Sequence, residues 1–131
     1  MIRLKKITTG DLNFARELRN KNRKYFFYDK EINKIEHEKW FKKIHKDKSL
    51  WFYIIFLGKI RIGTISYKKG EIGNVIIDKK YRHKGYLRKT IDILLEKYKG
   101  IVYLKVKHSN TKAIKAYKAL GFSEKEIILW K

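Results

Sequence analysis

The chain has 131 residues, a hydrophobic content of 44% and a net charge of +21 at pH 7. This length and this content predict one folded domain with a real core and exclude a disordered tail. No apolar run approaches the roughly 18 residues of a membrane-spanning helix, and residues 1–6 lack the apolar core of a signal peptide. Cysteine is absent, which excludes disulfides and thiolate chemistry, and residence in the cytoplasm is the expectation.

The positive charge comes mainly from lysine, with 27 lysines against 7 arginines. A basic surface attracts anions, among them nucleic acids, coenzyme A and nucleotide-linked substrates. The lysines are spread along the whole chain, and a dedicated nucleic-acid binder more often uses arginine for bidentate phosphate contacts. With 19 isoleucines and no proline, the profile is typical of AT-rich coding. We therefore interpret the charge first as compositional and keep nucleic-acid binding as the alternative.

The N-terminal third predicts one strand and two helices. Alternation over residues 2–7 indicates a strand, and Thr8 to Asp11 offer capping side chains before a helix that begins near Leu12. Residues 19–30 mix polar and aromatic side chains and are interpreted as an irregular loop. A second helix is expected over residues 33–44, with Trp40 and Phe41 on its apolar face.

The middle of the chain predicts three consecutive strands. Residues 50–57 form a continuous apolar run, as expected of a strand that is buried on both faces. A tight turn at Gly58 leads into an alternating strand over residues 60–67, and a second turn leads into residues 71–77. Short glycine turns between neighbouring strands indicate an antiparallel meander.

The C-terminal part returns to helical periodicity. A helix is expected from Gly85 to about Tyr98, ended by Gly100, followed by a strand over residues 101–106, a helix over residues 110–120 and a last strand over residues 126–130. The strand–helix–strand unit predicts a right-handed crossover between parallel strands. The fold class is therefore α+β: residues 1–131 form a single domain whose mixed central β-sheet, an antiparallel meander plus a parallel βαβ unit, is flanked by helices.

The turn before the third predicted helix has the pattern Arg82-x-x-Gly85-x-Leu87. A strand that leads through a turn into a helix leaves backbone N–H groups unpaired, and together with the helix dipole these bind phosphate. Gly85 allows a close approach to the backbone, and Lys84 and Arg88 add positive charge. The alternative is an ordinary solvated basic loop.

A second pattern consists of Asn110, Ala113, Tyr117 and the pair Gly121-Phe122. Asn110 and Tyr117 are seven residues apart, so on a helix they lie within about 20° of one face. The small side chain of Ala113 lies between them and leaves room for a ligand. Taken singly, Asn110 is also an ordinary helix N-cap and Tyr117 an ordinary half-buried aromatic residue.

The two patterns together resemble the GNAT (Gcn5-related) acetyltransferase family, whose motifs are Arg/Gln-x-x-Gly-x-Gly/Ala and Asn-x-x-Ala-x-x-x-Tyr before Gly-Phe. Leu87 departs from the first motif, and its side chain is expected to turn into the core. The family fold usually continues with a further strand beyond the last one expected here. The resemblance implies acetyl-CoA as cofactor and transfer of its acetyl group to a primary amine. The implied cofactor contacts are Val75, Ile76, Ile77, Arg82, His83, Lys84, Gly85, Tyr86, Leu87, Arg88, Asn110 and Tyr117.

The resemblance also implies catalytic roles. Tyr117 is expected to protonate the departing thiolate, a strand N–H near Ile76 to stabilise the oxyanion, and Glu71 to act as the base, directly or through water. Glu71 matches the Ala-Glu-Ile-Gly pattern of RimJ/RimL-like members; alternatively, it is a carboxylate at a turn, paired with a lysine. Lys105 stands where members that acetylate a ribosomal N-terminus have their glutamate, so that mechanism is not expected here.

Residues 18–41 resemble GNAT enzymes of surface-glycan pathways, which acetylate an amino sugar on a nucleotide carrier. Arg19, Arg23, Phe27 and Tyr28 are the expected acceptor contacts, the arginines on phosphate and the rings by stacking. The alternatives are a ribosomal-type peptide N-terminal acetyltransferase and a nonenzymatic anion or nucleic-acid binder. No metal site is expected from the spacing of the histidines. The chain is expected to be a monomer or a homodimer.

Overall fold

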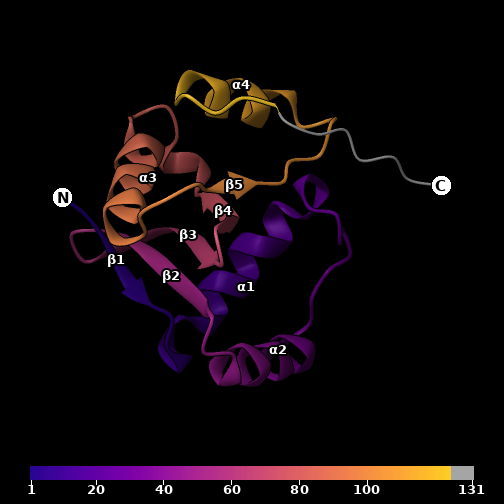
Figure 1. The fold of residues 1–131 in the computed structure, drawn as a ribbon. Coiled ribbons are helices and arrows are strands. Elements are labelled where there is room, and N and C mark those ends of the chain that lie inside the picture. Colours follow the sequence, from indigo (N-terminus) through magenta and orange to yellow (C-terminus); the bar gives the residue numbers. More distant parts are fainter. Residues whose placement is uncertain (125–131) are drawn as a thin grey trace.

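The computed structural model describes residues 1–124 and contains one five-stranded sheet (Figure 1). The strands lie in the order β1 (Ile2–Lys6), β2 (Leu50–Leu57), β3 (Ile60–Lys68), β4 (Glu71–Ile77) and β5 (Tyr103–Leu104). Neighbouring strands are antiparallel from β1 to β4, whereas β4 and β5 are parallel. The expected α+β class and the mixed sheet, an antiparallel meander followed by a parallel pair, are confirmed.

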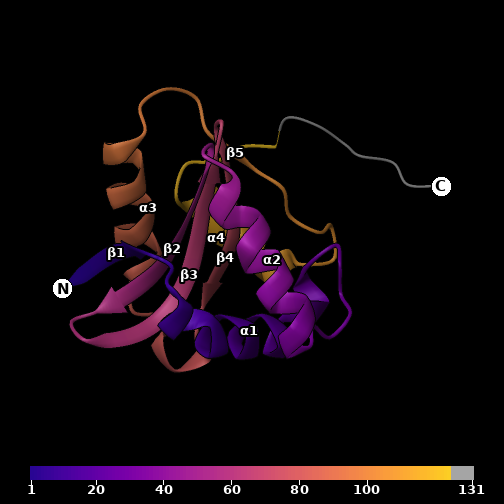
Figure 2. The ribbon, with the colours of Figure 1, turned by 90° about the horizontal axis from the view of Figure 1, so that it is seen from below.

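Helices cover both faces of this sheet (Figures 1 and 2). Helices α1 (Leu12–Lys21) and α2 (Lys34–Lys46) lie on one face, and α3 (Tyr86–Lys97) lies on the other. Helix α4 (Thr111–Ala119) follows β5 and lies at the end of the molecule beyond that strand. Three short 3-10 turns complete the described elements: η1 (Thr9–Asp11), η2 (Arg23–Tyr25) and η3 (Lys79–Tyr81).

The core has two layers because neighbouring residues of a strand point to opposite faces. Ile55 packs with Ile91 and Leu94 on the α3 face, and Ile54 packs with Ala15 on the α1 and α2 face. Ile54 and Ile55 are both 0% exposed, so the prediction that β2 is buried on both faces is confirmed. Burial of each such side chain stabilises the fold by about 1.5–3 kcal/mol.

The predicted loop over residues 19–30 begins too early. Helix α1 continues through Lys21, and η2 follows at residues 23–25. Asn22 ends the helix, and its Nδ2 donates to the carbonyl oxygen of Leu18 over 2.8 Å. The buried Leu18 holds the last turn of α1 against the sheet, so packing extends the helix into the polar segment.

The predicted strand over residues 101–106 is only two residues long in the structure. Tyr103 and Leu104 pair with Glu71 and Ile72, and Ile101 is 94% exposed. Val102 and Leu104 pack against the core, so the apolar alternation of this segment reflects packing more than strand pairing. In the described part of the chain, the later residues of β4 therefore have β3 on one side and no paired strand on the other.

The boundaries of the third helix agree with the glycine signals. Gly85 is the N-cap of α3 in a left-handed conformation, and Gly100 follows the helix with a φ of 107°. The strand expected over residues 126–130 lies outside the described residues. Among residues 1–124, none of the helices combines the length and the apolar character that crossing a membrane requires.

Candidate active site

Strand β4 carries a bulge in its middle. Thr64 pairs with Ile76 and Ser66 pairs with Gly73, so two residues of β4, Asn74 and Val75, stand opposite one residue of β3. Asn74 has a φ of 50°, a conformation that asparagine tolerates better than most residues. Thr64 Oγ1 donates to the carbonyl oxygen of Asn74 over 2.7 Å, and Asn74 Nδ2 donates to Ser66 Oγ over 2.9 Å.

The backbone of β4 beyond the bulge faces alternately toward and away from β3. The Asp78 N–H donates to the carbonyl oxygen of Ile62, which fixes the phase of this alternation. Ile76 therefore directs its amide toward β3, whereas Ile77 directs its amide to the opposite side, which β5 leaves open. Of the amides near Ile76, where the sequence predicts an oxyanion donor, that of Ile77 faces this open side.

The turn before α3 has the features of an anion site. Gly85 has a φ of 80°, and a Cβ atom placed on it would meet no atom within 4 Å. The first turn of α3 contains no acidic residue, and no side chain caps its N–H groups. His83, Lys84 and Arg88 are exposed around it. A diphosphate group fits this turn, because free N–H groups, positive charge and open space coincide there.

Leu87 turns away from this site. Its side chain packs against the core cluster around Ile91 and Leu94, as the sequence predicted for a residue larger than the glycine or alanine of the motif. A leucine at position 87 leaves the backbone N–H groups of Tyr86, Leu87 and Arg88 in place. The departure from the motif therefore leaves the backbone donors of the turn in place.

Arg82 has a different environment from the neighbouring basic residues. Its Nε donates to the carbonyl oxygen of Ile77 over 2.8 Å, and its Nη2 donates to Asn22 Oδ1 over 2.7 Å. The guanidinium group thus joins the end of β4 and the end of α1 to the turn. The exposed positive charge at this turn comes from Lys84 and Arg88.

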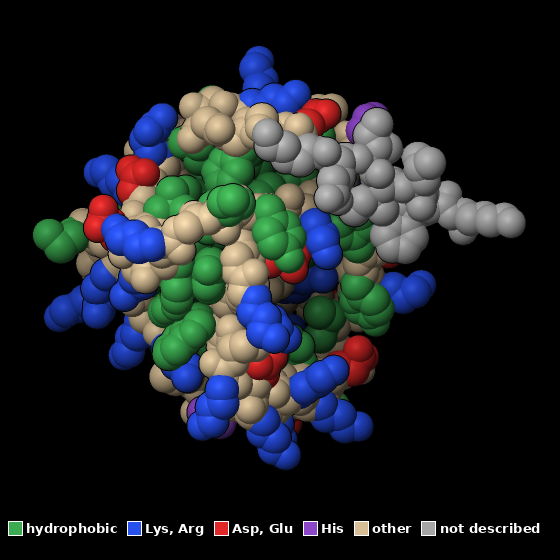
Figure 3. All heavy atoms as spheres, viewed as in Figure 1, with side chains coloured by type: hydrophobic (Ala, Val, Ile, Leu, Met, Phe, Trp, Pro, Cys, Tyr) green, Lys and Arg blue, Asp and Glu red, His purple; other side chains and the backbone are tan. Residues whose placement is uncertain are grey.

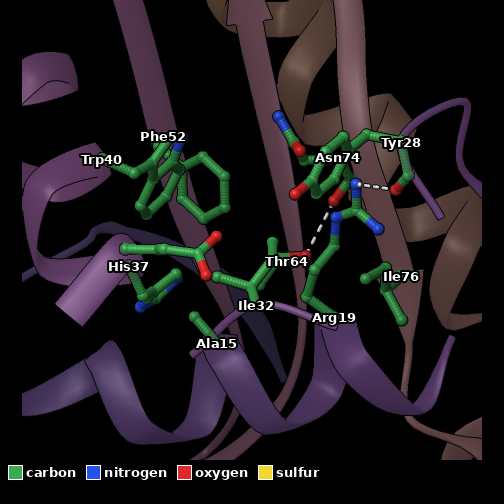
Figure 4. Close-up of a pocket in the computed structure, with 11 residues that line it drawn as sticks. Ala15, Arg19, Tyr28, Ile32, His37, Trp40, Phe52, Thr64, Asn74 and Ile76 are labelled. Carbon is green, nitrogen blue, oxygen red and sulfur yellow. Dashed lines mark hydrogen bonds between the residues drawn. The ribbon is translucent and has the colours of Figure 1, made fainter. Parts of the chain in front are cut away.

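A cavity of about 300 Å³ lies between the sheet and the two helices on its α1 and α2 face (Figure 4). It reaches the bulge, because Asn74 and Ile76 line it. Its other lining residues come from α1, the following loop, α2, β2 and β3: Ala15, Arg19, Tyr28, Ile32, Glu36, His37, Trp40, Phe52 and Thr64. The cavity and the open side of β4 thus meet at one short backbone segment.

Two of the four predicted acceptor residues line this cavity. Arg19 Nη2 donates to the carbonyl oxygen of Tyr28 over 3.0 Å, and the guanidinium lies 3.6 Å from the ring centroid of Phe26. Its Nη1 is buried and has no hydrogen-bond partner. Arg23 does not line the cavity and pairs with Glu31 over 3.4 Å, and Phe27 is half exposed outside it.

Helix α2 contributes cavity residues to which the sequence assigned no role. His37 is 5% exposed, and its ring stacks on Trp40 with 4.8 Å between centroids. Burial, and secondarily the charge of Arg16, lower the pKa of His37, so the imidazole is neutral at pH 7. Glu36 precedes it and places a carboxylate at the same cavity. The Glu-His-x-x-Trp pattern was visible in the sequence, but only the fold shows that all three side chains reach one cavity.

Helix α4 presents the second motif. Asn110 Oδ1 accepts a hydrogen bond from the Ala113 N–H over 3.3 Å, so Asn110 is the N-cap of α4. Tyr117 packs edge to face against Phe122 with 5.8 Å between centroids. Burial raises the pKa of Tyr117 to about 12. Its hydroxyl therefore stays protonated at physiological pH.

Glu71 lies at the start of β4 and does not line the cavity. Its carboxylate is 3.8 Å from Lys105 Nζ, which is the lysine pairing that the sequence left open as the alternative. Among residues 1–124, no group of three or more His, Cys, Asp or Glu side chains is placed to hold a metal ion.

A strand that is open on one side, a helix N-terminus suited to an anion and an adjoining cavity together suit an acyltransferase that uses coenzyme A. The sequence description of the acetyltransferase (GNAT) family matches residues 14–122. The chain belongs to this family, and it is an N-acetyltransferase that uses acetyl-CoA. No curated protein sequence matches it closely enough to count as a relative.

Solved structures share the fold over nearly the whole chain. Spermidine N-acetyltransferase from Vibrio cholerae, in complex with CoA and spermine, has a TM-score of 0.82 and 26% identity over 95% of this chain and 82% of its own. A domain from Methanocaldococcus jannaschii has a TM-score of 0.82 and 23% identity over 96% and 90%. The enzyme AAC(6')-Iy, bound to a bisubstrate analogue, has a TM-score of 0.77 and 18% identity over 100% and 97%. The last two show likeness of fold alone.

Proposed function

We propose that the acceptor is a primary amine on a small anionic molecule, and that this molecule is an amino sugar on a nucleotide carrier. One observation carries this proposal. Arg19 lines the cavity with a guanidinium whose Nη1 is buried and unpaired. A buried donor without a partner costs about 1–3 kcal/mol, so a phosphate or hydroxyl oxygen of the acceptor that approaches this group gains a charge-assisted hydrogen bond.

The charge of the chain supports an anionic acceptor. A net charge of +21 raises the local concentration of anions and opposes the approach of polycations. Lysine and arginine side chains are scattered over the face in Figure 3, so the field is broad and not confined to one patch.

A polyamine is the second candidate. The Vibrio cholerae structure that is 26% identical contains spermine, and Glu36 provides a carboxylate at the cavity. A carboxylate beside the aromatic rings of Trp40 and Phe52 suits a cationic amine. The acceptor screen described below separates these two candidates.

The proposed roles of the chain in the reaction follow from the site. Acetyl-CoA supplies an acetyl group activated as a thioester. The turn over residues 82–88, with Val75, Ile76 and Ile77 along β4 and with Asn110 and Tyr117 from α4, is the proposed cofactor site. An outward amide of β4 stabilises the negative charge that develops on the carbonyl oxygen. Tyr117 donates the proton that the leaving sulfur requires, and Glu71 accepts the proton of the amine through water.

A thiol-release assay over three acceptor classes tests the proposal. Amino-sugar nucleotides should turn over with a higher kcat/KM than spermidine and than peptides with free N-termini. Arg19→Gln should raise KM for the amino-sugar nucleotide by about tenfold, the loss of roughly one charge-assisted hydrogen bond. Arg3→Gln, on β1 and away from the cavity, is the charge-matched control. Faster turnover of spermidine, with no effect of Arg19→Gln, would replace the proposal with the polyamine function.

The identity of the base is tested with two glutamates. Glu71→Gln should lower kcat at pH 7 by at least about tenfold, as expected for the loss of a general base, and should leave KM for acetyl-CoA unchanged. Glu36→Gln tests the carboxylate that lines the cavity. A loss of kcat with Glu36→Gln alone would transfer the role from Glu71 to Glu36.

A further inference from the structure

The geometry points to Thr64 as a positioning residue for acetyl transfer. Its hydroxyl holds the peptide group between Asn74 and Val75 so that the Val75 N–H faces the open side of β4. This inference rests on the acetyl-CoA chemistry of the family and does not depend on which amine is the acceptor.

The orientation follows from the planar trans peptide, in which the C=O and N–H bonds point in opposite directions. The Asn74 carbonyl oxygen accepts from Thr64 Oγ1 over 2.7 Å and is therefore directed toward β3. The N–H of the same peptide group, which belongs to Val75, must point away from β3.

A second hydroxyl on β3 fixes the other part of the bulge. Ser66 Oγ accepts from Asn74 Nδ2 over 2.9 Å, and Ser66 is two residues from Thr64, on the same face of the strand. Asn74 adopts a positive φ, which for a residue other than glycine costs of order 1 kcal/mol or more and persists only where neighbours enforce it. Thr64 and Ser66 together supply that enforcement.

Burial favours a single direction for the hydrogen bond that the hydroxyl of Thr64 donates. Thr64 and Ser66 are 2% and 3% exposed, and Ile62 and Ile65 of the same strand are fully buried. With so little of the side chain exposed, solvent replaces a lost protein partner of the hydroxyl poorly, so that loss is costly. The Asn74 carbonyl is thus held in one direction, and the outward N–H needs little reorganisation when charge develops on the substrate oxygen.

Thr90 offers a matched control. It is also a fully buried threonine, and its Oγ1 donates to a backbone carbonyl, that of Tyr86, over 2.8 Å. This bond lies within α3 and does not involve the bulge. Thr64→Val and Thr90→Val remove the same atoms from equally buried sites, so a purely structural role predicts the same consequences for both.

The amide signal of Val75 gives a readout that needs no acceptor amine. The chain has three valines, Val75, Val102 and Val106, so nitrogen-15-labelled valine yields three amide signals, and Val75→Ile identifies the first. Addition of acetyl-CoA without amine should move the Val75 amide proton downfield in the native chain, in Thr64→Ser and in Thr90→Val. In Thr64→Val this shift should be lost while the Val102 and Val106 signals still report a folded chain.

Kinetics with the amine that turns over fastest complete the test. Thr64→Val should lower kcat by up to about 10²-fold, the lower end of the loss of one oxyanion donor, with KM for acetyl-CoA within about threefold. Thr64→Ser should restore kcat. If Thr64→Val does not fold, the comparison passes to Thr64→Ala and Thr64→Ser. The inference would be overturned if Thr64→Val kept both the acetyl-CoA-induced shift of the Val75 amide and the native kcat. It would also be overturned if acetyl-CoA did not shift the Val75 amide in the native chain.

Discussion

Arg82 Nη2 donates to Asn22 Oδ1 over 2.7 Å, a hydrogen bond between residues sixty positions apart that joins the cofactor turn to the end of α1. Asn22 is buried and also caps α1, the helix that carries Arg19 into the cavity. The turn proposed to hold the cofactor and the helix proposed to contact the acceptor are therefore linked through one side-chain pair.

Arg82→Gln should destabilise the fold because it removes charge-assisted hydrogen bonds to Ile77 and Asn22 and leaves partly buried acceptors without this donor. We expect a loss of about 2–3 kcal/mol in the free energy of unfolding, measured with urea, and a higher KM for acetyl-CoA. The exposed Arg88→Gln should change stability by less than about 0.5 kcal/mol. Equal stability of the two variants would show that the Arg82 bonds contribute nothing net.

Lys84 and Arg88 should act on the cofactor through charge. Both are exposed beside the N-terminus of α3, and their replacement by glutamine should weaken binding of CoA, with a larger effect at low salt because screening grows with ionic strength. Calorimetric titration with CoA at two salt concentrations measures this. Lys97→Gln, at the other end of α3, is the control and should leave affinity unchanged. A salt-independent loss would indicate a contact of another kind.

Much of the fold follows from local patterns in the sequence. The meander from β2 to β4 is determined by alternation and glycine turns, and α3 by its apolar spacing after Gly85. The short length of β5 cannot be predicted from the local sequence, because residues 101–106 have the pattern of a longer strand. Only their position relative to β4 determines how many of them pair. The bulge at Asn74 is equally nonlocal, because it requires hydroxyls from β3.

The candidate site, like the fold, could be predicted from local sequence patterns only in part. The turn over residues 82–88 could be recognised because one short segment carries its donors. Arg82 shows the limit of such recognition, since its partners Asn22 and Ile77 are brought to it only by the tertiary fold. The cavity could be predicted only in part: Arg19 and Tyr28 line it, whereas Thr64 and Asn74 read in the sequence as ordinary strand residues.

Gly63 is a position in β3 where the backbone of β4 approaches closely. A Cβ atom at Gly63 would lie 2.2 Å from the carbonyl oxygen of Ile76, which is shorter than any contact a folded chain accepts. Gly63→Ala should therefore displace β4 or unfold the sheet, with a fall in the thermal midpoint of several degrees. Gly58→Ala is the control for space, since nothing lies within 4 Å there, although its φ of 61° adds some strain. Equal midpoints for the two variants would contradict the close approach.

The pH dependence of Tyr117 follows from the direction of its pKa shift. Burial raises the pKa to about 12, above the value of about 10 for an exposed tyrosine, so the protonated form persists in the folded chain at high pH. A proton donor is active while protonated, so kcat should show no alkaline fall from Tyr117 between about pH 8 and 10. The same raised pKa contributes stability that is fully present below pH 10 and is lost as the pH rises toward 12.

Replacing Tyr117 by phenylalanine tests separately its role as proton donor and its contribution to stability at alkaline pH. Tyr117→Phe should lower kcat by about 10²-fold or more, as expected for the loss of a general acid, while affinity for CoA in calorimetric titration changes little. It should also remove the part of the alkaline destabilisation that Tyr117 causes in urea unfolding. Tyr25→Phe, an exposed tyrosine on η2, is the control and should alter neither kcat nor the alkaline stability. If Tyr117→Phe keeps the native kcat at pH 7, another group must supply the proton to the leaving sulfur.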